Sequence, residues 1–296
     1  MSNSPTPSPT LALLTDFGIQ DGYAGILKGA IQTVFAAHNI STVPVIDITH
    51  QIPSQQVAQG AWVLQTSKDF FPKGTVFVCV VDPKVGTSRQ RGILVHCKAR
   101  EQFFIAPDNG LLTPVLQAGG DKVAVYEITN DKYYRQCPFA DDPAEVSHTF
   151  HGRDIYAPVA AHLAGAIAAG SAGKFLQDIG SEVSDAVQLT MDPPRQYSSE
   201  KTTMVEGTIR HIDVFGNLIT DIPNTWVPDD ADLEARIVAR ETTWFTRQLE
   251  TYAQGEGKDH TFVLPGSNGT IELARYQASA KDLLDAAVGD MVALSW

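Results

Sequence analysis

The sequence predicts an α/β N-terminal domain with a mostly parallel sheet, followed by a small all-β C-terminal barrel domain. Over the first 190 residues, short apolar runs alternate with segments of helical period, a pattern typical of a helix-covered parallel sheet. The stretch Met191–Arg195 contains two prolines and has the composition of a linker. Beyond it the helical periods largely stop, and short strands separated by Pro, Gly and Asn turns favour a small barrel or sandwich.

Length and composition narrow the class of protein. A chain of 296 residues with 43% hydrophobic and 19% charged residues is typical of a globular protein of one large or two ordinary domains. The net charge of −12, without a basic run, argues against nucleic acid or an anionic membrane as the main partner. No apolar stretch reaches the roughly 20 residues that span a bilayer. A small-molecule partner is therefore expected.

The cysteines and the N-terminus indicate the compartment. Cys79, Cys97 and Cys137 are scattered without CxxC spacing, which favours free thiols in a reducing compartment. Residues 1–10, MSNSPTPSPT, have neither a basic n-region nor an apolar h-region, so a disordered leader is expected and not a signal peptide. The two domains are then expected at 11–190 and 196–296, and the protein in the cytoplasm.

The first predicted strand leads directly into a turn suited to a ligand. Residues Leu11–Leu14 are apolar and precede the sequence TDFG, which contains Asp16. A segment of helical period follows from Tyr23. Asp16 and Asp21 therefore lie at a strand-to-helix turn, where α/β proteins hold ligands, and ribose hydroxyls are good partners for such carboxylates. Capping of the helix is the alternative role for Asp21.

A second turn of this kind follows the most apolar strand of the chain. Val76–Val81 is rich in β-branched residues and fits no helical period, so it predicts a buried strand. It ends at Asp82, and Arg89 and Arg91 follow in a polar loop. Ligands bind outside the carboxyl ends of parallel strands, so an acid and an arginine here could form a charge pair at a site. A structural Asp that caps the loop is the alternative.

The remaining elements of the first domain follow the same pattern. They are expected as strands at 43–48, 92–97, 102–106 and 122–128, with a helix within 51–71 and another opening after the turn at 107–112. A polar loop then leads to His151, just before an Ala-rich helix. His151 is either an active-site base or a loop histidine satisfied by backbone groups. A metal pair with His148 lacks a third ligand of suitable spacing, so no metal site is expected.

The second domain contains one notable turn. Its strands are expected at 205–212, 218–221, 233–238, 261–264, 270–275 and 290–295. Between the first two, Asp213, Phe215 and Asn217 bring an acid, an aromatic ring and an amide together. This set could stack on and hydrogen-bond a base or an amino-acid group, and its alternative is an ordinary Asn/Gly turn.

Six of these segments together resemble one family, the S-adenosyl-L-methionine hydroxide adenosyltransferases, which are relatives of the fluorinase and chlorinase enzymes. The matching segments, in the order of that family, are TDFG with Asp21, IDITHQI, VVDPKVGTSR, APDNGLL, FHGRD and DVFGN. The resemblance implies an α/β domain, a β-barrel, and a homotrimer with ligand sites between subunits. It also implies that S-adenosylmethionine is the substrate, split by water or hydroxide into adenosine and methionine without a cofactor.

The resemblance also assigns residues. The family's catalytic Asp, Arg and His map onto Asp82, Arg89 and His151, whereas the halogenating relatives carry a tyrosine at the first position and lack the histidine. The ribose carboxylate maps to Asp16, and the methionine-binding acid maps to Asp213. The complete set of substrate contacts implied is Asp16, Asp21, Asn109, Phe150, Asp213, Phe215, Asn217, Phe245, Ser267 and Arg275.

Two positions depart from the family pattern. Lys84 stands where the family usually has Gly, and Gln55 stands where the fluorinase places a Trp against the ligand. Both change the packing expected around the ligand and not the reaction.

Two other classes of function remain as alternatives. One is a non-catalytic sensor or scavenger that binds adenosyl ligands in the same pockets. The other is a metal-dependent hydrolase built on His50, His148, His151 and the nearby acids.

Overall fold

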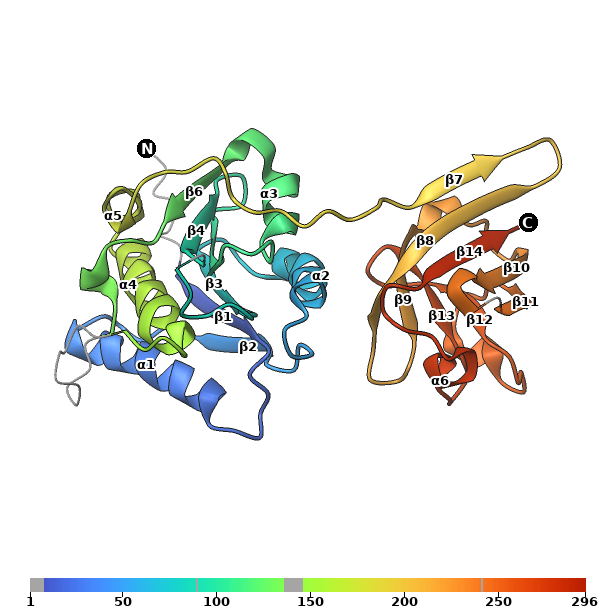
Figure 1. The fold of residues 1–296 in the computed structure, drawn as a ribbon, viewed down its shortest axis with the longest axis horizontal. Coiled ribbons are helices and arrows are strands. Elements are labelled where there is room, and N and C mark those ends of the chain that lie inside the picture. The colour runs from blue at the N-terminus through green and yellow to red at the C-terminus, as the bar shows by residue number, and fades with distance from the viewer. Residues whose placement is uncertain (1–7, 89, 136–145, 241) are drawn as a thin grey trace. The chain divides into compact units, whose positions relative to one another are not determined.

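The computed structural model describes residues 8–88, 90–135, 146–240 and 242–296 (Figure 1). The leader expected over residues 1–10 lies mostly outside these residues, and the first strand begins at Thr10. The chain divides into two compact units, residues 1–189 and 190–296. Each unit is described by itself.

The first unit is built on a six-stranded mixed sheet with strand order β2-β1-β3-β5-β4-β6. Its strands are β1 (Thr10–Thr15), β2 (Val45–Thr49), β3 (Thr75–Val80), β4 (Gly92–Cys97), β5 (Gln102–Pro107) and β6 (Val123–Glu127). The pairings β1–β2, β1–β3 and β3–β5 are parallel, while β4 pairs antiparallel with both β5 and β6. The prediction of a mostly parallel sheet is therefore confirmed in part: β2, β1, β3 and β5 are parallel neighbours, and β4 runs against the strands on both sides of it. The connection from β4 to β5 is too short for a parallel crossover, which explains the reversal.

Helices cover both faces of this sheet. They are α1 (Tyr23–Ala37), α2 (Val57–Ser67), α3 (Thr113–Gly119), α4 (Ala157–Ala168) and α5 (Ala172–Ile179). Short 3-10 turns occupy Lys68–Phe70, Gly120–Lys122 and Asp131–Tyr133, and a π-helical turn spans Gly152–Tyr156. In Figure 1, α1 and α4 lie on one face and α2 and α3 on the other.

The two faces have separate apolar cores because successive strand residues point to opposite sides. Leu11 and Leu13 of β1 pack with α1, α4 and α5, whereas Ala12 and Leu14 pack with α2 and α3. Strand β3 is buried along its whole length. Its carboxyl end, at Asp82, is therefore held on a rigid part of the unit. None of the described helices combines the length and apolar composition needed to cross a membrane.

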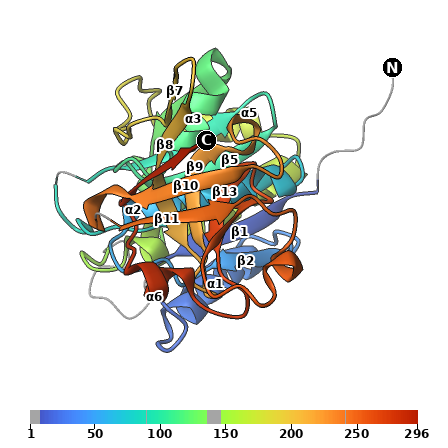
Figure 2. The same cartoon turned by 90° about the vertical axis from the view of Figure 1, so that its right-hand side faces the viewer.

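The second unit is all-β apart from one short helix. Its strands are β7 (Arg195–Ser198), β8 (Thr203–Ile212), β9 (Leu218–Pro223), β10 (Asp232–Ile237), β11 (Thr242–Arg247), β12 (Phe262–Pro265), β13 (Thr270–Ala274) and β14 (Met291–Ser295). The helix is α6 (Ala280–Leu284), and 3-10 turns occupy Asn224–Trp226, Val238–Arg240 and Tyr252–Gly255. Figure 2 looks onto this unit, with β10 and β11 side by side.

The strands of this unit curl into a barrel-like sheet. Their order is β11-β10-β14-β8-β9-β13-β12, with β7 added on β8. A bridge between Gln248 and Val263 joins the chain after β11 to β12, the opposite edge of the sheet. The core contains Val205, Ile209 and Leu218 among other apolar residues. The sequence predicted an all-β barrel here, but it did not predict β7 or β11.

The described cysteines, Cys79 and Cys97, are free and buried. Cys137 lies outside the described residues.

Candidate functional site

The turn after β1 is fixed by contacts to the chain after β2. Thr15 Oγ1 lies 2.8 Å from His50 Nδ1 and accepts a hydrogen bond from Phe17 N at 3.2 Å. Gly18 N donates to the His50 carbonyl at 2.7 Å. The Asp16 carboxylate, at the end of β1, accepts from Gln55 N at 2.9 Å. Asp16 is therefore held at the carboxyl edge of the sheet, where α/β proteins bind ligands.

Asp82 is half-buried at the end of β3 and incompletely satisfied. Its Oδ1 accepts from Lys84 N at 3.3 Å, while its Oδ2 is buried and has no hydrogen-bond partner among the described residues. The pKa of Asp82 is raised to about 6, mainly by burial; the hydrogen bond from the Lys84 N–H opposes this rise and the nearby negative charge of Asp16 contributes to it. A carboxylate with such a pKa is ionised at neutral pH and still accepts a proton readily.

His151 lies immediately before the π-helical turn Gly152–Tyr156. Its ring is half-buried, and burial lowers its pKa although Asp154 opposes the shift. At neutral pH the imidazole is therefore uncharged, which is the form that accepts a proton.

The loops that carry Asp82 and His151 lie against each other. Gly86 has φ of +76°, and a Cβ at this position would lie 1.8 Å from the His148 carbonyl oxygen. Only glycine permits this approach. The loop before His151 is in turn anchored by Asp154, which is 1% exposed in side chain and bound by Arg153, Arg135 and the Ser147 N–H.

The predicted arginine of this group, Arg89, lies outside the described residues. The next arginine, Arg91, forms ion pairs with acids other than Asp82. Its guanidinium binds Asp108 at 2.8 Å and Asp185 at 2.7 Å. Arg91 thus fastens the chain before β4 to the last segment of the first unit.

Other predicted residues of the first unit have distinct surroundings. Phe150 contacts Phe17 and Tyr23 edge-on, with ring centroids 5.4 and 5.3 Å apart. Asp21 is exposed, and α1 has Gly22 at its N-cap without a side-chain hydrogen bond, so the capping role considered for Asp21 is wrong. Asn109 donates from Nδ2 to the Val81 carbonyl at 2.8 Å, directly beside Asp82.

In the second unit, the turn that begins at Asp213 is held by hydrogen bonds among its own residues. Asp213 Oδ1 accepts from the N–H groups of Phe215 and Asn217, both at 2.9 Å. Asp213 Oδ2 accepts from Asn217 Nδ2 at 2.9 Å. These bonds leave the Phe215 ring 74% exposed. A rigid turn that presents an aromatic ring is suited to stacking on a planar ligand.

This turn borders a cavity of about 610 Å³. The cavity is lined by Asp213, Phe215, Asn217, Tyr252, Arg275, Tyr276, Gln277, Ala278 and Ser279. The structure thus brings four of the sequence-predicted residues together. Sequence reasoning missed Tyr252, whose hydroxyl donates to Glu272 at 2.7 Å. The aromatic residue itself was the only signal, because it belongs to none of the six motifs.

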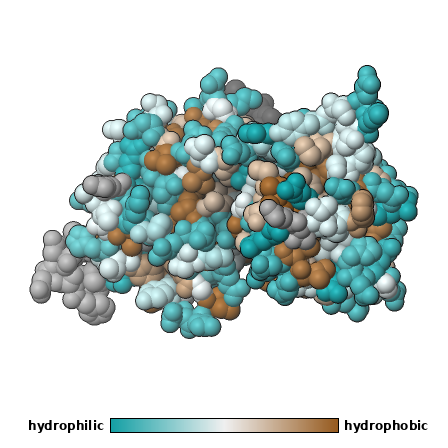
Figure 3. Space-filling model, turned by 45° about the vertical axis from the view of Figure 1, so that its right-hand side comes forward, coloured by the Kyte–Doolittle hydropathy of each residue, from teal (hydrophilic) through white to brown (hydrophobic). Residues whose placement is uncertain are grey.

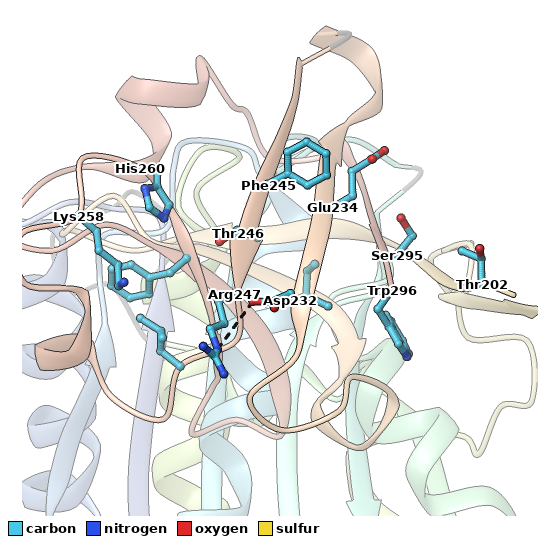
Figure 4. Close-up of a pocket in the computed structure, with 13 residues that line it drawn as sticks. Thr202, Asp232, Glu234, Phe245, Thr246, Arg247, Lys258, His260, Ser295 and Trp296 are labelled. Carbon is cyan, nitrogen blue, oxygen red and sulfur yellow. Dashed lines mark ion pairs between the residues drawn. The ribbon is translucent and has the colours of Figure 1, made fainter.

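Phe245 and Ser267 are not among the residues that line this cavity. Phe245 is on β11 and lines a different cavity, of about 630 Å³, with Arg247, Lys258, His260 and Trp296 among its neighbours (Figure 4). Ser267 is exposed in the turn between β12 and β13.

Within the described ranges, no group of three or more His, Cys, Asp or Glu side chains is arranged to hold a metal ion. The metal-hydrolase alternative was built on His50, His148, His151 and the acids near them. His50 instead faces Thr15 and Asp47, with His50 Nε2 3.1 Å from Asp47 Oδ1.

Comparison with known proteins identifies the family. The model of the SAM hydroxide adenosyltransferase N-terminal domain matches residues 11–173, and the model of the C-terminal domain matches residues 207–293. This chain belongs to the SAM hydroxide adenosyltransferase family. The two matches lie in the two structural units.

Relatives named as hydrolases and relatives named as fluorinases are both similar to this chain over nearly their whole length. An (R)-S-adenosyl-L-methionine hydrolase of Salinispora tropica is 31% identical over 293 residues, covering 96% of this chain and 97% of the relative. A fluorinase of an Actinoplanes species is 30% identical and covers 92% of both chains. The crystal structure of an uncharacterized conserved protein from Thermotoga maritima matches with a TM-score of 0.80 at 31% identity, covering 96% of this chain and 99% of that one.

Proposed function

We propose that this chain is an S-adenosyl-L-methionine hydrolase that forms adenosine and L-methionine by in-line attack of water or hydroxide on the ribose 5′ carbon. The observation that carries the proposal is the half-buried Asp82 carboxyl at the carboxyl end of β3, with a pKa of about 6 and an Oδ2 that has no hydrogen-bond partner among the described residues. His151, uncharged at neutral pH, lies in the loop packed against it. The relative from Salinispora tropica that carries the hydrolase name supports the same assignment.

The reaction makes few demands on acid catalysis. As the new C5′–O bond forms, the C5′–S bond breaks and its electron pair goes to sulfur, so the sulfonium leaves as a neutral thioether. The attacking water loses a proton to Asp82 or His151. We assign Arg89 to hold the developing hydroxide by charge-assisted hydrogen bonds. Orienting water and substrate in line supplies up to about 7–11 kcal/mol of the barrier reduction.

Substrate contacts are assigned to both units. Asp16 binds the ribose hydroxyls, with Asp21, Asn109 and Phe150 nearby in the first unit. In the second unit, Asp213 binds the methionine ammonium, while Phe215 and Asn217 face the adenosine. Arg275, in the same cavity, pairs with the methionine carboxylate. Phe245 and Ser267 make further contacts with the substrate. The reaction uses substrate and water alone, without a cofactor or a metal.

We propose that the working assembly is a homotrimer with sites between subunits. The split of the contact residues between the two units supports this. Apolar side chains also stay exposed beside both halves: Ile19, Tyr23 and Ile26 near Asp16, and Val214 and Phe215 near Asp213. Figure 3 shows exposed apolar side chains among hydrophilic ones on the face drawn. Such surfaces are typical of contacts with other chains or ligands. The free buried thiols Cys79 and Cys97 support a reducing, cytoplasmic location.

Isotope labelling tests the reaction directly. In oxygen-18 water, adenosine should gain one heavy oxygen and methionine none. Methylthioadenosine, or unlabelled adenosine, would overturn the assigned reaction. Efficient formation of a halogenated nucleoside in high fluoride or chloride would move the chain to the halogenase branch. Binding measured by calorimetry, without release of methionine, would identify an adenosyl-ligand sensor instead.

A further inference from the structure

Tyr156 is the largest fully buried side chain among the described residues, and its hydroxyl has no hydrogen-bond partner there. The side chain is 1% exposed. Leaving a buried hydroxyl unpaired costs roughly 1–3 kcal/mol, so native proteins seldom keep one without a purpose. Tyr156 also ends the π-helical turn that starts after His151, and such turns occur often at functional sites.

The hydroxyl of Tyr156 and the carboxyl of Asp82 lie on the same side of the sheet. Val76, Val78 and Val80 belong to the apolar core that contains Tyr156. Successive residues of an extended chain alternate between faces, so Asp82 continues this row. The negative charge of Asp82 contributes to raising the Tyr156 pKa, after the larger effect of burial, which agrees with their proximity.

The Tyr156 ring is fixed by its neighbours. A Cβ at Gly92 would lie 2.8 Å from Tyr156 Cε1, so β4 packs directly on the ring. The His151 ring meets it edge-on, with centroids 6.5 Å apart. A side chain packed in this way keeps one direction for its hydroxyl. Asp82 Oδ2 is also buried and has no hydrogen-bond partner among the described residues, so it and the Tyr156 hydroxyl are not bonded directly in this structure.

We propose that Tyr156 is a positioning residue whose hydroxyl is joined to Asp82 Oδ2 by hydrogen bonds through one water, and so holds Oδ1 toward the attacking water. This inference rests on the proposed hydrolase function. A hydrogen bond to a carboxylate favours its ionised form, so Tyr156 keeps Asp82 competent as a base at lower pH. Tyr156 stays protonated throughout, because burial moves its pKa far above the working range.

Among the described residues, Asp16 at the end of β1 is the neighbour whose charge acts on Asp82, and Lys84 contributes its backbone N–H. The His151 ring meets the ring of Tyr156 itself. None of these groups is altered in a Tyr156→Phe variant. A change in the Asp82 pKa in that variant is therefore attributable to the lost hydroxyl.

The test compares Tyr156→Phe with Tyr134→Phe as the matched control. The Tyr134 side chain is partly buried, and its hydroxyl donates to the Ile128 carbonyl at 3.0 Å. In Tyr156→Phe, the acidic limb of the pH profile for methionine release should move up by about one pH unit. Turnover should then be about fivefold lower at pH 6 and nearly unchanged at pH 8, with KM within about twofold. Tyr134→Phe should keep the wild-type limb.

A second measurement does not depend on turnover. Carbon-13 NMR of labelled aspartate carboxyls, with the Asp82 signal assigned from Asp82→Asn, gives the Asp82 pKa directly. A higher Asp82 pKa in folded Tyr156→Phe than in wild type supports the proposal. An equal or lower value overturns it, as does an unmoved acidic limb. If wild-type protein releases no methionine but the NMR shift appears, the proposed function fails while the Tyr156–Asp82 contact stands.

Discussion

The Asp82 carboxyl is stabilised in its protonated form by the folded protein, because burial and Asp16 both disfavour its charge. Its pKa is raised from 3.8 to about 6 on folding. The native state therefore binds this proton more tightly than the unfolded chain does. It follows that stability decreases as pH rises between these two values. Ionised Asp82 thus costs stability at neutral pH, in exchange for a stronger base.

Replacing Asp82 with Asn should separate stability from activity. Asp82→Asn should lower turnover by about 100-fold or more, since general-base catalysis contributes on that order. It should also raise stability at pH 8 by roughly 1–2 kcal/mol after allowing for partial exposure, and leave it unchanged near pH 3, below the pKa of the unfolded chain. Thermal unfolding at both pH values measures the second effect.

Asp47 provides a control whose pKa shift on folding has the opposite sign. Burial tends to raise its pKa, but hydrogen bonds with Lys28 and His50 lower it overall. Asp47→Asn should therefore reduce stability at pH 8. Equal losses of stability in both variants would contradict the role given to the Asp82 environment.

At the scale of elements, the carboxyl ends of β1 and β3 carry the carboxylates assigned to the reaction, and the loops around them fix the positions of these side chains. The contact of Gly86 with the His148 carbonyl is the tightest of these loop contacts. Gly86→Ala should push the two loops apart and lower turnover on the order of 100-fold, because displacements near 1 Å have effects of this size. Steady-state kinetics on folded protein measures it.

Gly170 is the matched control for this substitution. It also has positive φ, +67°, but no atom lies within 4 Å of a Cβ built there. Gly170→Ala should cost about 1–2 kcal/mol of stability from backbone strain alone and leave turnover intact. Comparable kinetic losses in both variants would show that strain, and not the loop contact, matters.

The turn after β1 offers a test on substrate binding. Thr15→Val removes the hydroxyl that joins His50 Nδ1 and Phe17 N. Asp16 is assigned to the ribose, so we expect KM to rise about tenfold with a smaller change in kcat. Thr33→Val, at a solvent-exposed hydroxyl that donates to the Gly29 carbonyl of its own helix, should change neither.

Some of these elements were predictable from local pattern and others were not. The buried run 76–81 and the acid that ends it were sufficient to predict β3 and Asp82. The antiparallel direction of β4 was missed because the period of hydrophobic residues carries no information on strand direction. The short connection 98–101 did carry this information, since it is too short for a parallel crossover. The π-helical turn was missed because its residues also fit an ordinary helix. Tyr156 was thus assigned no role, since a tyrosine in an Ala-rich helix is usually part of the core.

The barrel illustrates a different limit. The Asp213–Asn217 turn has its own sequence signature, and the structure places it on a cavity. Tyr252 and Phe245 are distant from it in sequence and carry no motif. Which of the two reaches that cavity depends on how β11 and the chain after it cross the barrel. Only the folded sheet determines that.

At the scale of the whole molecule, the residues assigned to the reaction are divided between two units. Mixing inactive Asp82→Ala and Asp213→Ala proteins should restore about a quarter of wild-type activity after subunit exchange, because a quarter of shared sites in a cyclic trimer then receive both intact residues. Light scattering should give the mass of three chains. Sites formed within one chain would recover nothing on mixing, and full activity from a monomer would contradict the trimer.

Because each unit has its own core, its unfolding can be followed by a separate spectroscopic signal. Three of the four tryptophans, Trp226, Trp244 and Trp296, pack against the barrel core, whereas Trp62 is on α2. Units with their own cores need not unfold together. A Trp62→Phe variant would therefore have emission that reports on the barrel alone, while circular dichroism at helical wavelengths follows the α/β unit. Denaturant curves from the two signals would coincide only if each half depends on the other for its stability.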